Sequence, residues 1–260
     1  MKKNIVFIVD VKLPGKQQEV GRWAETRSDP YKFCIDSWKH WCKKNDCELF
    51  ILNDLILPHE EMPISWQRYY IFDLLEANNI EYDQILYVDA DTIVHPDCPN
   101  VFETSERKFC FVHNEGRYDW ILRSIENYSK HFFDGYMIPW YYYFDSGMLI
   151  FNETHKEFFK MIIDFFHTNR ENLLNAEKTW HAGTDQTPVN FLVHLNNIDY
   201  KVLPYEYNMV DMCRKEILND ELTMTKIGWI YHFNCIPNNK DDQLTYHWMS
   251  KTYQHLYNNQ

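Results

Sequence analysis

Short apolar runs alternate with amphipathic helical patterns in the first third of the chain, and this alternation limits the possible folds more than any other feature. The apolar runs at Asn4–Val9, Cys47–Leu52 and Gln84–Val88 have the length of buried strands. The spacing of apolar residues between them predicts helices over Tyr31–Lys44 and Ser65–Asn78. Strands joined through helices in this order form a mostly parallel sheet with helices on both faces. The sequence therefore predicts an α/β fold.

The second half of the chain contains the same kinds of element in a less regular order. The expected strands are Phe109–Val112, Tyr143–Phe151, Tyr200–Leu203 and Trp229–Phe233. The expected helices are Trp120–Phe133, His155–His167, Asp185–Leu195 and Gln243–Tyr257. Because no internal repeat and no Pro/Gly/Ser-rich linker divides the 260 residues, we expect a single domain over residues 1–260.

The charge and glycine content exclude two classes of ligand site. The chain has 26 Lys and Arg against 38 Asp and Glu, a formal net charge of −12. A protein that binds nucleic acid by neutralising phosphates normally has the opposite sign, so we expect no nucleic-acid partner. With only 7 glycines, a glycine-rich phosphate loop is not expected either. An anionic ligand would therefore need a bound cation or a local basic patch.

Cysteine usage and the apolar runs indicate a cytoplasmic protein without a transmembrane segment. The seven cysteines are an odd number and form no C-x-x-C pair, which fits reduced thiols better than disulfides or structural zinc. The first apolar run, Ile5–Val9, is ended by Asp10 and is too short for the core of a signal peptide. No stretch of 18 apolar residues is present.

The segment Ile85–Val94 combines a buried strand with two aspartates, Asp89 and Asp91, spaced i, i+2. In open α/β sheets, ligands bind beyond the carboxyl ends of the strands. Two carboxylates at such a position can hold a divalent cation, and the cation can take diphosphate oxygens as further ligands. The structural alternative is an acidic pair that is solvated or caps a helix. The evidence for a metal site therefore lies in the position of the motif at the end of a buried strand rather than in the motif itself.

At this point the chain resembles the GT-A glycosyltransferases that carry a D-x-D motif, especially the retaining glycogenin-like family and the galactosyl- and xylosyltransferases. The resemblance rests on six motifs in the expected order. They are Trp66-Gln67-Arg68, Asp89-Ala90-Asp91, Tyr143–Ile150 around Asp145-Ser146-Gly147, Gly183-Thr184-Asp185-Gln186, Leu203-Pro204 with Tyr207-Asn208, and Tyr231-His232-Phe233.

The resemblance implies a single GT-A domain that transfers a hexose or pentose from a nucleoside-diphosphate sugar to a glycan or glycoprotein, with retention of configuration. The donor would be a UDP- or GDP-sugar, and residues 1–95 and 96–260 would form a nucleotide-binding half and an acceptor- and sugar-binding half. Asp89, Asp91 and His232 would hold Mn²⁺ or Mg²⁺, which would stabilise the charge of the leaving diphosphate.

The remaining candidate residues take their roles from the same resemblance. The donor-binding residues would be Arg68, Asp10 for the base or ribose, Asp89, Asp145, Ser146 and Lys240. Asp185 would bind hydroxyls of the donor sugar, and Gln186 would face the β-side of its anomeric carbon. Structural roles compete with these: Asp185 as a helix-terminal partner, His232 as a core histidine, and Arg68 on a solvated helix face.

The chain departs from the family pattern at two places. Asp145 stands where an Asn is usual, and Cys235 and Asn238 occupy the positions of a Gly and a Lys after the histidine, with Lys240 as the nearest lysine. The aromatic run Met137–Phe144 is most simply explained as core, although aromatic rings also stack on sugar faces.

Two other functions remain open from the sequence alone. A haloacid-dehalogenase-like phosphatase also has a D-x-D motif after a strand, but its nucleophile usually lies near the N-terminus, whereas Asp89 has 88 residues before it. A catalytically inactive GT-A-like protein that binds glycans is the non-enzymatic alternative.

Overall fold

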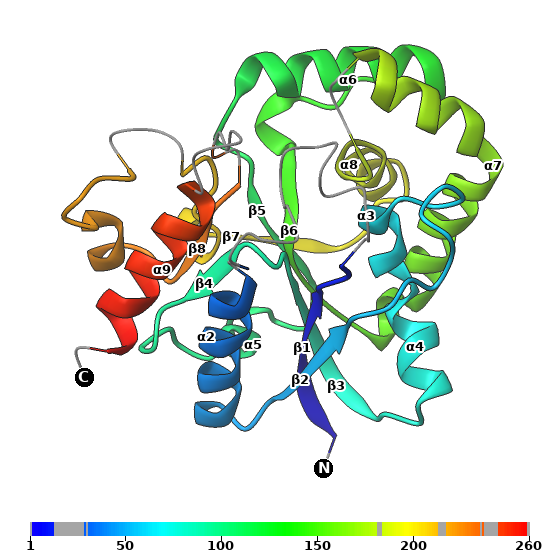
Figure 1. The fold of residues 1–260 in the computed structure, drawn as a ribbon. Coiled ribbons are helices and arrows are strands. Elements are labelled where there is room, and N and C mark those ends of the chain that lie inside the picture. Colours follow the sequence, from blue (N-terminus) through cyan, green and yellow to red (C-terminus); the bar gives the residue numbers. More distant parts are fainter. Residues whose placement is uncertain are drawn as a thin grey trace.

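A six-stranded sheet forms the centre of the computed structural model, which describes residues 2–12, 29, 31–180, 184–212, 217–234, 236 and 244–258. Its strand order is β2-β1-β3-β6-β5-β7. The strands are β1 (Lys3–Val9), β2 (Glu48–Leu52), β3 (Tyr82–Val88), β5 (Phe109–His113), β6 (Phe144–Asn152) and β7 (Tyr200–Leu203). Figure 1 shows these strands side by side with helices on both faces, which confirms the predicted fold class.

The direction of the strands decides which residues share an edge of the sheet. β1 pairs in parallel with β2 and β3, and β5 with β7, whereas β6 runs antiparallel to both of its neighbours. The carboxyl ends of β1, β3 and β5 therefore lie at the same edge as the amino end of β6. This edge brings together Asp10, Asp89 and Asp145, which the sequence places at three separate strand ends.

A second, two-stranded sheet joins β4 (Thr92–Val94) to β8 (Ile230–His232) in antiparallel register. The sequence analysis predicted β8 but not β4, because three residues directly after the D-x-D motif are too few to show a period.

The helices cover the central sheet from both sides. They are α2 (Tyr31–Lys44), α3 (Ile64–Gln67), α4 (Ile71–Ala77), α5 (Val101–Thr104), α6 (Tyr118–Phe132), α7 (Lys156–Trp180), α8 (Gln186–Leu195) and α9 (Leu244–Tyr257). Short 3₁₀ turns span Arg68–Tyr70, Trp140–Tyr142, Glu153–His155, Tyr205–Tyr207 and Thr223–Lys226. In Figure 1, α2 and α9 lie on one side of the sheet, and α4, α7 and α8 lie on the other. None of the helices in the described ranges is both long and apolar enough to cross a membrane.

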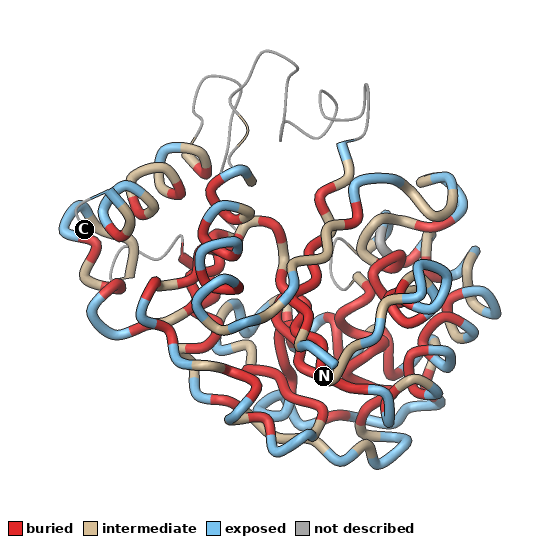
Figure 2. The backbone as a smooth tube through the Cα atoms, turned by 90° about the horizontal axis from the view of Figure 1, so that it is seen from below, coloured by how far each residue is buried: buried red, intermediate tan, exposed pale blue. Residues whose placement is uncertain are grey.

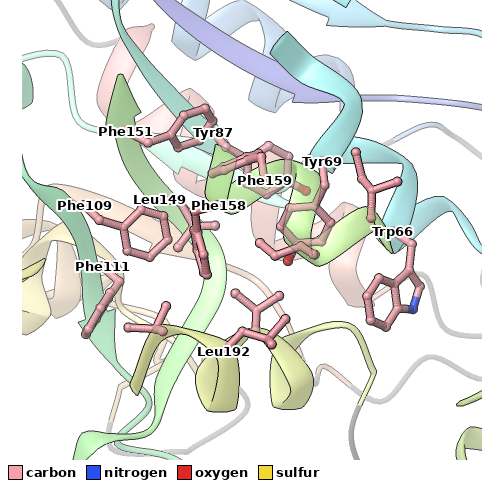
Figure 3. Packing of buried hydrophobic residues seen from close by; sticks show 14 of the residues in the cluster. Trp66, Tyr69, Tyr87, Phe109, Phe111, Leu149, Phe151, Phe158, Phe159 and Leu192 are labelled. Atoms are coloured by element: carbon pink, nitrogen blue, oxygen red, sulfur yellow. The ribbon is translucent and has the colours of Figure 1, made fainter. Parts of the chain in front are cut away.

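Two hydrophobic clusters fill the space between the sheet and these helices. Odd-numbered β1 residues such as Phe7 pack with α4, α7 and α8, while even-numbered ones such as Val6 pack with α2 and α9. Figure 3 shows the first cluster, where Phe158 and Phe159 of α7 lie among aromatic side chains of the strands. The buried backbone runs through the middle of the molecule in Figure 2. Much of the aromatic content is therefore core.

Three predicted segments differ from the structure. The helix expected over Ser65–Asn78 is divided by a 3₁₀ turn at Arg68–Tyr70, which directs Arg68 into the interior. The helix expected to end at His167 continues to Trp180. The run Met137–Phe144 is only partly core: Ile138, Tyr143 and Phe144 are buried, whereas Met137, Trp140, Tyr141 and Tyr142 are exposed.

Candidate active site

The two aspartates of the D-x-D motif lie in a tight turn that follows β3. Thr92 donates both its backbone N–H (3.2 Å) and its hydroxyl (2.8 Å) to the carbonyl oxygen of Asp89. The Thr92 hydroxyl in turn accepts a 3.0 Å hydrogen bond from the indole of Trp38 on α2. The turn is thus fastened to a buried helix, which fixes where Asp89 and Asp91 can point.

The β4–β8 pair brings His232 to this turn from the far end of the chain. Thr92 lies opposite His232 in the register, and the backbone N–H of Phe233 donates to the carbonyl of Asp91 (2.8 Å). The His232 Nε2 atom lies 3.1 Å from Asp91 Oδ1 and 3.5 Å from Asp89 Oδ2. The structure therefore brings together the three residues predicted as metal ligands.

The geometry and chemistry of these three side chains fit a divalent cation. Their ligand atoms all lie within 4.8 Å of one another. Neighbouring ligands of an octahedral ion with bonds of about 2.1 Å are separated by about 3 Å, close to the two distances measured from His232. Carboxylate oxygens with one imidazole nitrogen suit Mn²⁺ or Mg²⁺, the imidazole favouring the former.

The opposite nitrogen of His232 is held by two buried side chains. His232 Nδ1 donates to Asn208 Oδ1 at 3.2 Å and lies 3.4 Å from Asp145 Oδ1. Both partners accept hydrogen bonds at these atoms, so Nδ1 carries a hydrogen. Nε2 then faces Asp89 and Asp91 with a lone pair, unless a proton occupies it. Two carboxylates around one nitrogen require a cation or a proton between them.

The charges at this edge shift the pKa values of its titratable groups. Burial alone would lower the pKa of His232, but the carboxylates of Asp91 and Asp145 outweigh it and raise that pKa well above its ordinary value. Burial raises the pKa of Asp89, although Arg68 and His232 partly oppose this. Burial would also raise the pKa of Asp145, yet its hydrogen bond and charge interaction with His232 lower it. The carboxylates around His232 therefore favour a positive charge on its ring.

Arg68 connects the D-x-D turn to the start of α8. Its Nη1 lies 3.2 Å from Asp89 Oδ1, and its Nη2 forms an ion pair with Asp185 and donates to Ser146 Oγ at 2.7 Å. The side chain is buried, so the solvated helix face considered above is wrong for Arg68. Burial would lower its pKa, but Asp185 and Asp89 keep the guanidinium charged. The Arg68 guanidinium thus provides a positive charge between the Asp89 and Asp185 carboxylates.

Two tyrosines that the sequence analysis did not assign hold these carboxylates. The Tyr69 hydroxyl donates to Asp185 Oδ2 at 2.7 Å, and the Tyr87 hydroxyl donates to Asp89 Oδ1. The Arg68 guanidinium lies over both rings, 5.2 Å and 4.7 Å from their centroids. Tyr87 lies in β3 two residues before Asp89, so the alternation of strand side chains directs it to the side on which Asp89 follows, a signal present in the sequence.

Asp185 and Gln186 lie at the amino end of α8, as predicted. The Asp185 side chain does not cap the helix, because its carboxylate is turned to Arg68 and Tyr69. Gln186 Oε1 accepts hydrogen bonds from the Ser146 backbone N–H (3.0 Å) and hydroxyl (3.3 Å). Ser146 thereby joins Arg68 to Gln186, and the predicted sugar-binding residues form one network.

Gly147 allows the network to close around the predicted metal ligands. A methyl group at this residue would lie 2.7 Å from Asp89 Oδ2 and closer still to His232 Cε1. Its carbonyl oxygen also accepts a hydrogen bond from the Asp89 backbone N–H (2.9 Å). The absence of a side chain at residue 147 is thus a condition for the approach of β6 to the D-x-D turn.

The last two candidates are Asp10 and Lys240. Asp10 follows β1 at the same edge of the sheet, where burial and the charge of Asp29 raise its pKa, and its other charged neighbour is Lys12. Its contact with the base or ribose stays a prediction. Lys240 falls outside the described residues.

Comparison with known proteins identifies the family. The family model "Glycosyl transferase family 8" matches residues 16–240. A search of curated protein sequences found no match. Among solved structures, a glycosyltransferase involved in the glycosylation of the major capsid of PBCV-1 superimposes with a TM-score of 0.55 at 11% identity, over 97% of this chain and 98% of that one. The apo form of the glycosyltransferase GlyE of Streptococcus pneumoniae TIGR4 gives a TM-score of 0.51 at 16% identity, over 100% of this chain and 63% of that one.

At these identities the two structures support the fold, and the family match supports the class of enzyme. The match covers most of the chain and contains all six motifs that carried the resemblance. It also favours a transferase over the phosphatase considered above. The chain belongs to glycosyl transferase family 8.

Proposed function

We propose that this glycosyltransferase moves a hexose or pentose from a UDP- or GDP-sugar to a hydroxyl group of a glycan or glycoprotein, with Mn²⁺ or Mg²⁺ and with retention of configuration. The observation that carries the proposal is that the predicted metal ligands and the predicted sugar-binding residues lie together at one edge of the sheet. Asp89, Asp91 and His232 form a ligand set for a divalent ion, and Arg68 links it to Asp185, next to Gln186.

This arrangement suits the loss of a nucleoside diphosphate, which gains negative charge as the glycosidic bond breaks. When bound, the metal would supply Lewis-acid stabilisation of that charge. Arg68 adds a fixed positive charge that is already oriented by Asp89 and Asp185, so it need not reorganise during the reaction. Asp185 and Ser146 would orient the donor sugar.

The proposed retention rests on Gln186, the residue that the resemblance places at the β-face of the anomeric carbon. An inverting transferase needs a carboxylate that takes the proton of the acceptor. Asp145 accepts from the Gly147 N–H and the Asn208 amide, and Asp185 is bound by Arg68 and Tyr69. The side chain next to Asp185 is an amide, Gln186, which is no strong base. The diphosphate leaving group could then serve as the base.

A panel of nucleotide sugars tests the proposed activity. With Mn²⁺ present, we expect release of nucleoside diphosphate from one donor, and no release in excess EDTA. Phosphate release from p-nitrophenyl phosphate would support the phosphatase instead, and glycan binding without turnover would support the inactive glycan-binding protein.

Stereochemistry is tested on the product. We expect NMR to show an α-linkage from an α-linked donor, and a β-linkage would refute retention. Gln186→Ala should lower kcat more than it raises the donor KM, because the contact matters most as charge develops at the anomeric carbon.

A further inference from the structure

An exposed group of aromatic side chains lies between α6 and β6, and the site described above does not use it. We call it the aromatic ledge; it consists of Tyr118, Tyr136, Trp140, Tyr141 and Tyr142. Each of these side chains is between 40% and 53% exposed. Four of the rings form a chain of contacts, with centroids 5.0 Å apart for Tyr118 and Trp140, 5.7 Å for Trp140 and Tyr141, and 4.7 Å for Tyr141 and Tyr142. The fifth, Tyr136, contacts the ring of Phe191 on α8 instead. Large exposed rings in mutual contact mark a binding surface more often than a solvated one.

The strand directions place the ledge at the edge of the sheet that holds the metal ligands. Trp140–Tyr142 is a 3₁₀ turn that leads directly into β6, whose amino end lies beside the carboxyl end of β3. Tyr118 opens α6, shortly after β5 ends at that same edge. On its other side the ledge contacts α8, since the Tyr142 ring lies 5.7 Å from that of His194. The segment from α6 to β6 can be followed in Figure 1.

The chemistry of the ledge selects an uncharged partner that has both apolar faces and hydroxyl groups. The segment Gly135–Phe144, which holds four of the five ledge residues, contains no charged residue, although the chain carries a net charge of −12. All five members of the ledge are Tyr or Trp, whose rings offer an apolar face and whose edges offer O–H or N–H groups. The C–H face of a pyranose packs on such a ring through dispersion and weak C–H contacts, while its hydroxyls bond to the polar edges.

We propose that the aromatic ledge binds sugar units of an oligosaccharide acceptor that lie beyond the unit receiving the transferred sugar. The inference rests on the proposed function, in which a glycan is the acceptor. It adds that the acceptor is an oligosaccharide rather than a monosaccharide, because the ledge residue Tyr142 contacts His194, near the opposite end of α8 from Gln186.

Binding to an array of defined oligosaccharides, with monosaccharides as competitors, tests the proposal. The wild-type protein should bind a subset of the oligosaccharides. Trp140→Ala and Tyr141→Ala should each weaken that binding by about tenfold, the scale for losing an aromatic anchor from an interface. Trp140→Phe should retain most of the binding, because it keeps a stacking face. Ile227→Ala is the matched control: Ile227 is 71% exposed and lies outside the ledge, so this variant should bind as the wild type does.

A second readout separates this proposal from the proposed function. Hydrolysis of the donor without acceptor should be the same in wild type and in Trp140→Ala, whereas the KM for the oligosaccharide should rise in the variant. If the wild-type protein hydrolysed no donor but the ledge variants still lost oligosaccharide binding, the proposed function would be refuted and the binding role of the ledge would stand. Unchanged oligosaccharide binding by Trp140→Ala would overturn the ledge. The proposal would also be overturned if Trp140→Ala bound oligosaccharides normally but lost self-association or binding to phosphatidylcholine vesicles.

Discussion

Asn208 fixes the orientation of His232 from the side opposite Asp89 and Asp91. Its Oδ1 accepts a 3.2 Å hydrogen bond from His232 Nδ1, and its Nδ2 donates to Asp145 Oδ1 at 3.0 Å. The imidazole therefore presents Nε2 to Asp89 and Asp91, in the way that residues behind a metal ligand commonly set its tautomer.

Removing this support should weaken metal binding while the fold remains. We expect Asn208→Ala to lower Mn²⁺ affinity by about 10- to 100-fold, the usual range for residues that orient a ligand. Electron paramagnetic resonance of free Mn²⁺ measures the change. Asn196→Ala, an amide at the end of α8, is the control. Equal affinities for Asn208→Ala and wild type would mean that the hydrogen bond to His232 has no effect on the site.

Metal affinity should rise as the pH increases above neutrality. In the metal-free protein, burial lowers the pKa of His232, but Asp91 and Asp145 raise it more strongly. The pKa of His232 is therefore well above its ordinary value. A proton on Nε2 must leave before a metal can bind there, so Mn²⁺ binding should release protons.

Calorimetry in two buffers of different ionisation enthalpy counts these protons. We expect His232→Gln to bind Mn²⁺ more weakly and to release fewer protons than wild type. Proton release that is zero in wild type, or unchanged in His232→Gln, would return His232 to a structural role.

Much of this site was predictable because strand ends are visible in a sequence. The apolar runs before Asp10 and Asp89 predicted parallel strands, and the carboxyl ends of parallel strands share an edge. The helix starting near Asp185 was equally clear from its apolar residues. The predicted metal ligands Asp89, Asp91 and His232 do meet in the structure.

The rest depended on contacts that leave no local pattern. The antiparallel direction of β6 and the short β4–β8 pair are set by tertiary pairing, and the β4–β8 pair is what delivers His232. The inward turn of Arg68 required the 3₁₀ turn within an otherwise helical pattern. The exposure of Trp140 could not be predicted either, since an apolar aromatic run gives no sign of which rings face the solvent.

Gly147→Ala should disturb the site more than the fold. The added methyl group would lie against Asp89 Oδ2 and His232 Cε1, so one of them must move. We expect a loss of about 1–3 kcal/mol in the free energy of unfolding, typical of added volume in a packed region, and a larger relative loss of Mn²⁺ affinity. Urea unfolding and Mn²⁺ titration measure the two effects. Normal Mn²⁺ affinity in this variant would show that β6 need not approach the turn so closely.

Arg68→Met should be strongly destabilising. It would leave the buried Asp185 carboxylate without its cation, and breaking a buried pair in this way costs about 3–5 kcal/mol. Arg123→Met removes an exposed pair with Asp119 and should cost less than about 1 kcal/mol. Urea unfolding of the two variants gives the comparison, and equal losses would argue against the central place of Arg68 in the network.

The central claim is that Asp89, Asp91 and His232 hold a divalent ion that the reaction requires. Equilibrium binding of Mn²⁺ to the wild-type protein and to Asp91→Ala tests it most directly, with circular dichroism as the check on folding. We predict one Mn²⁺ site in the wild type and its loss in a folded Asp91→Ala protein, together with the loss of sugar transfer. Mn²⁺ binding of equal strength in both proteins, or sugar transfer that persists in Asp91→Ala, would contradict it.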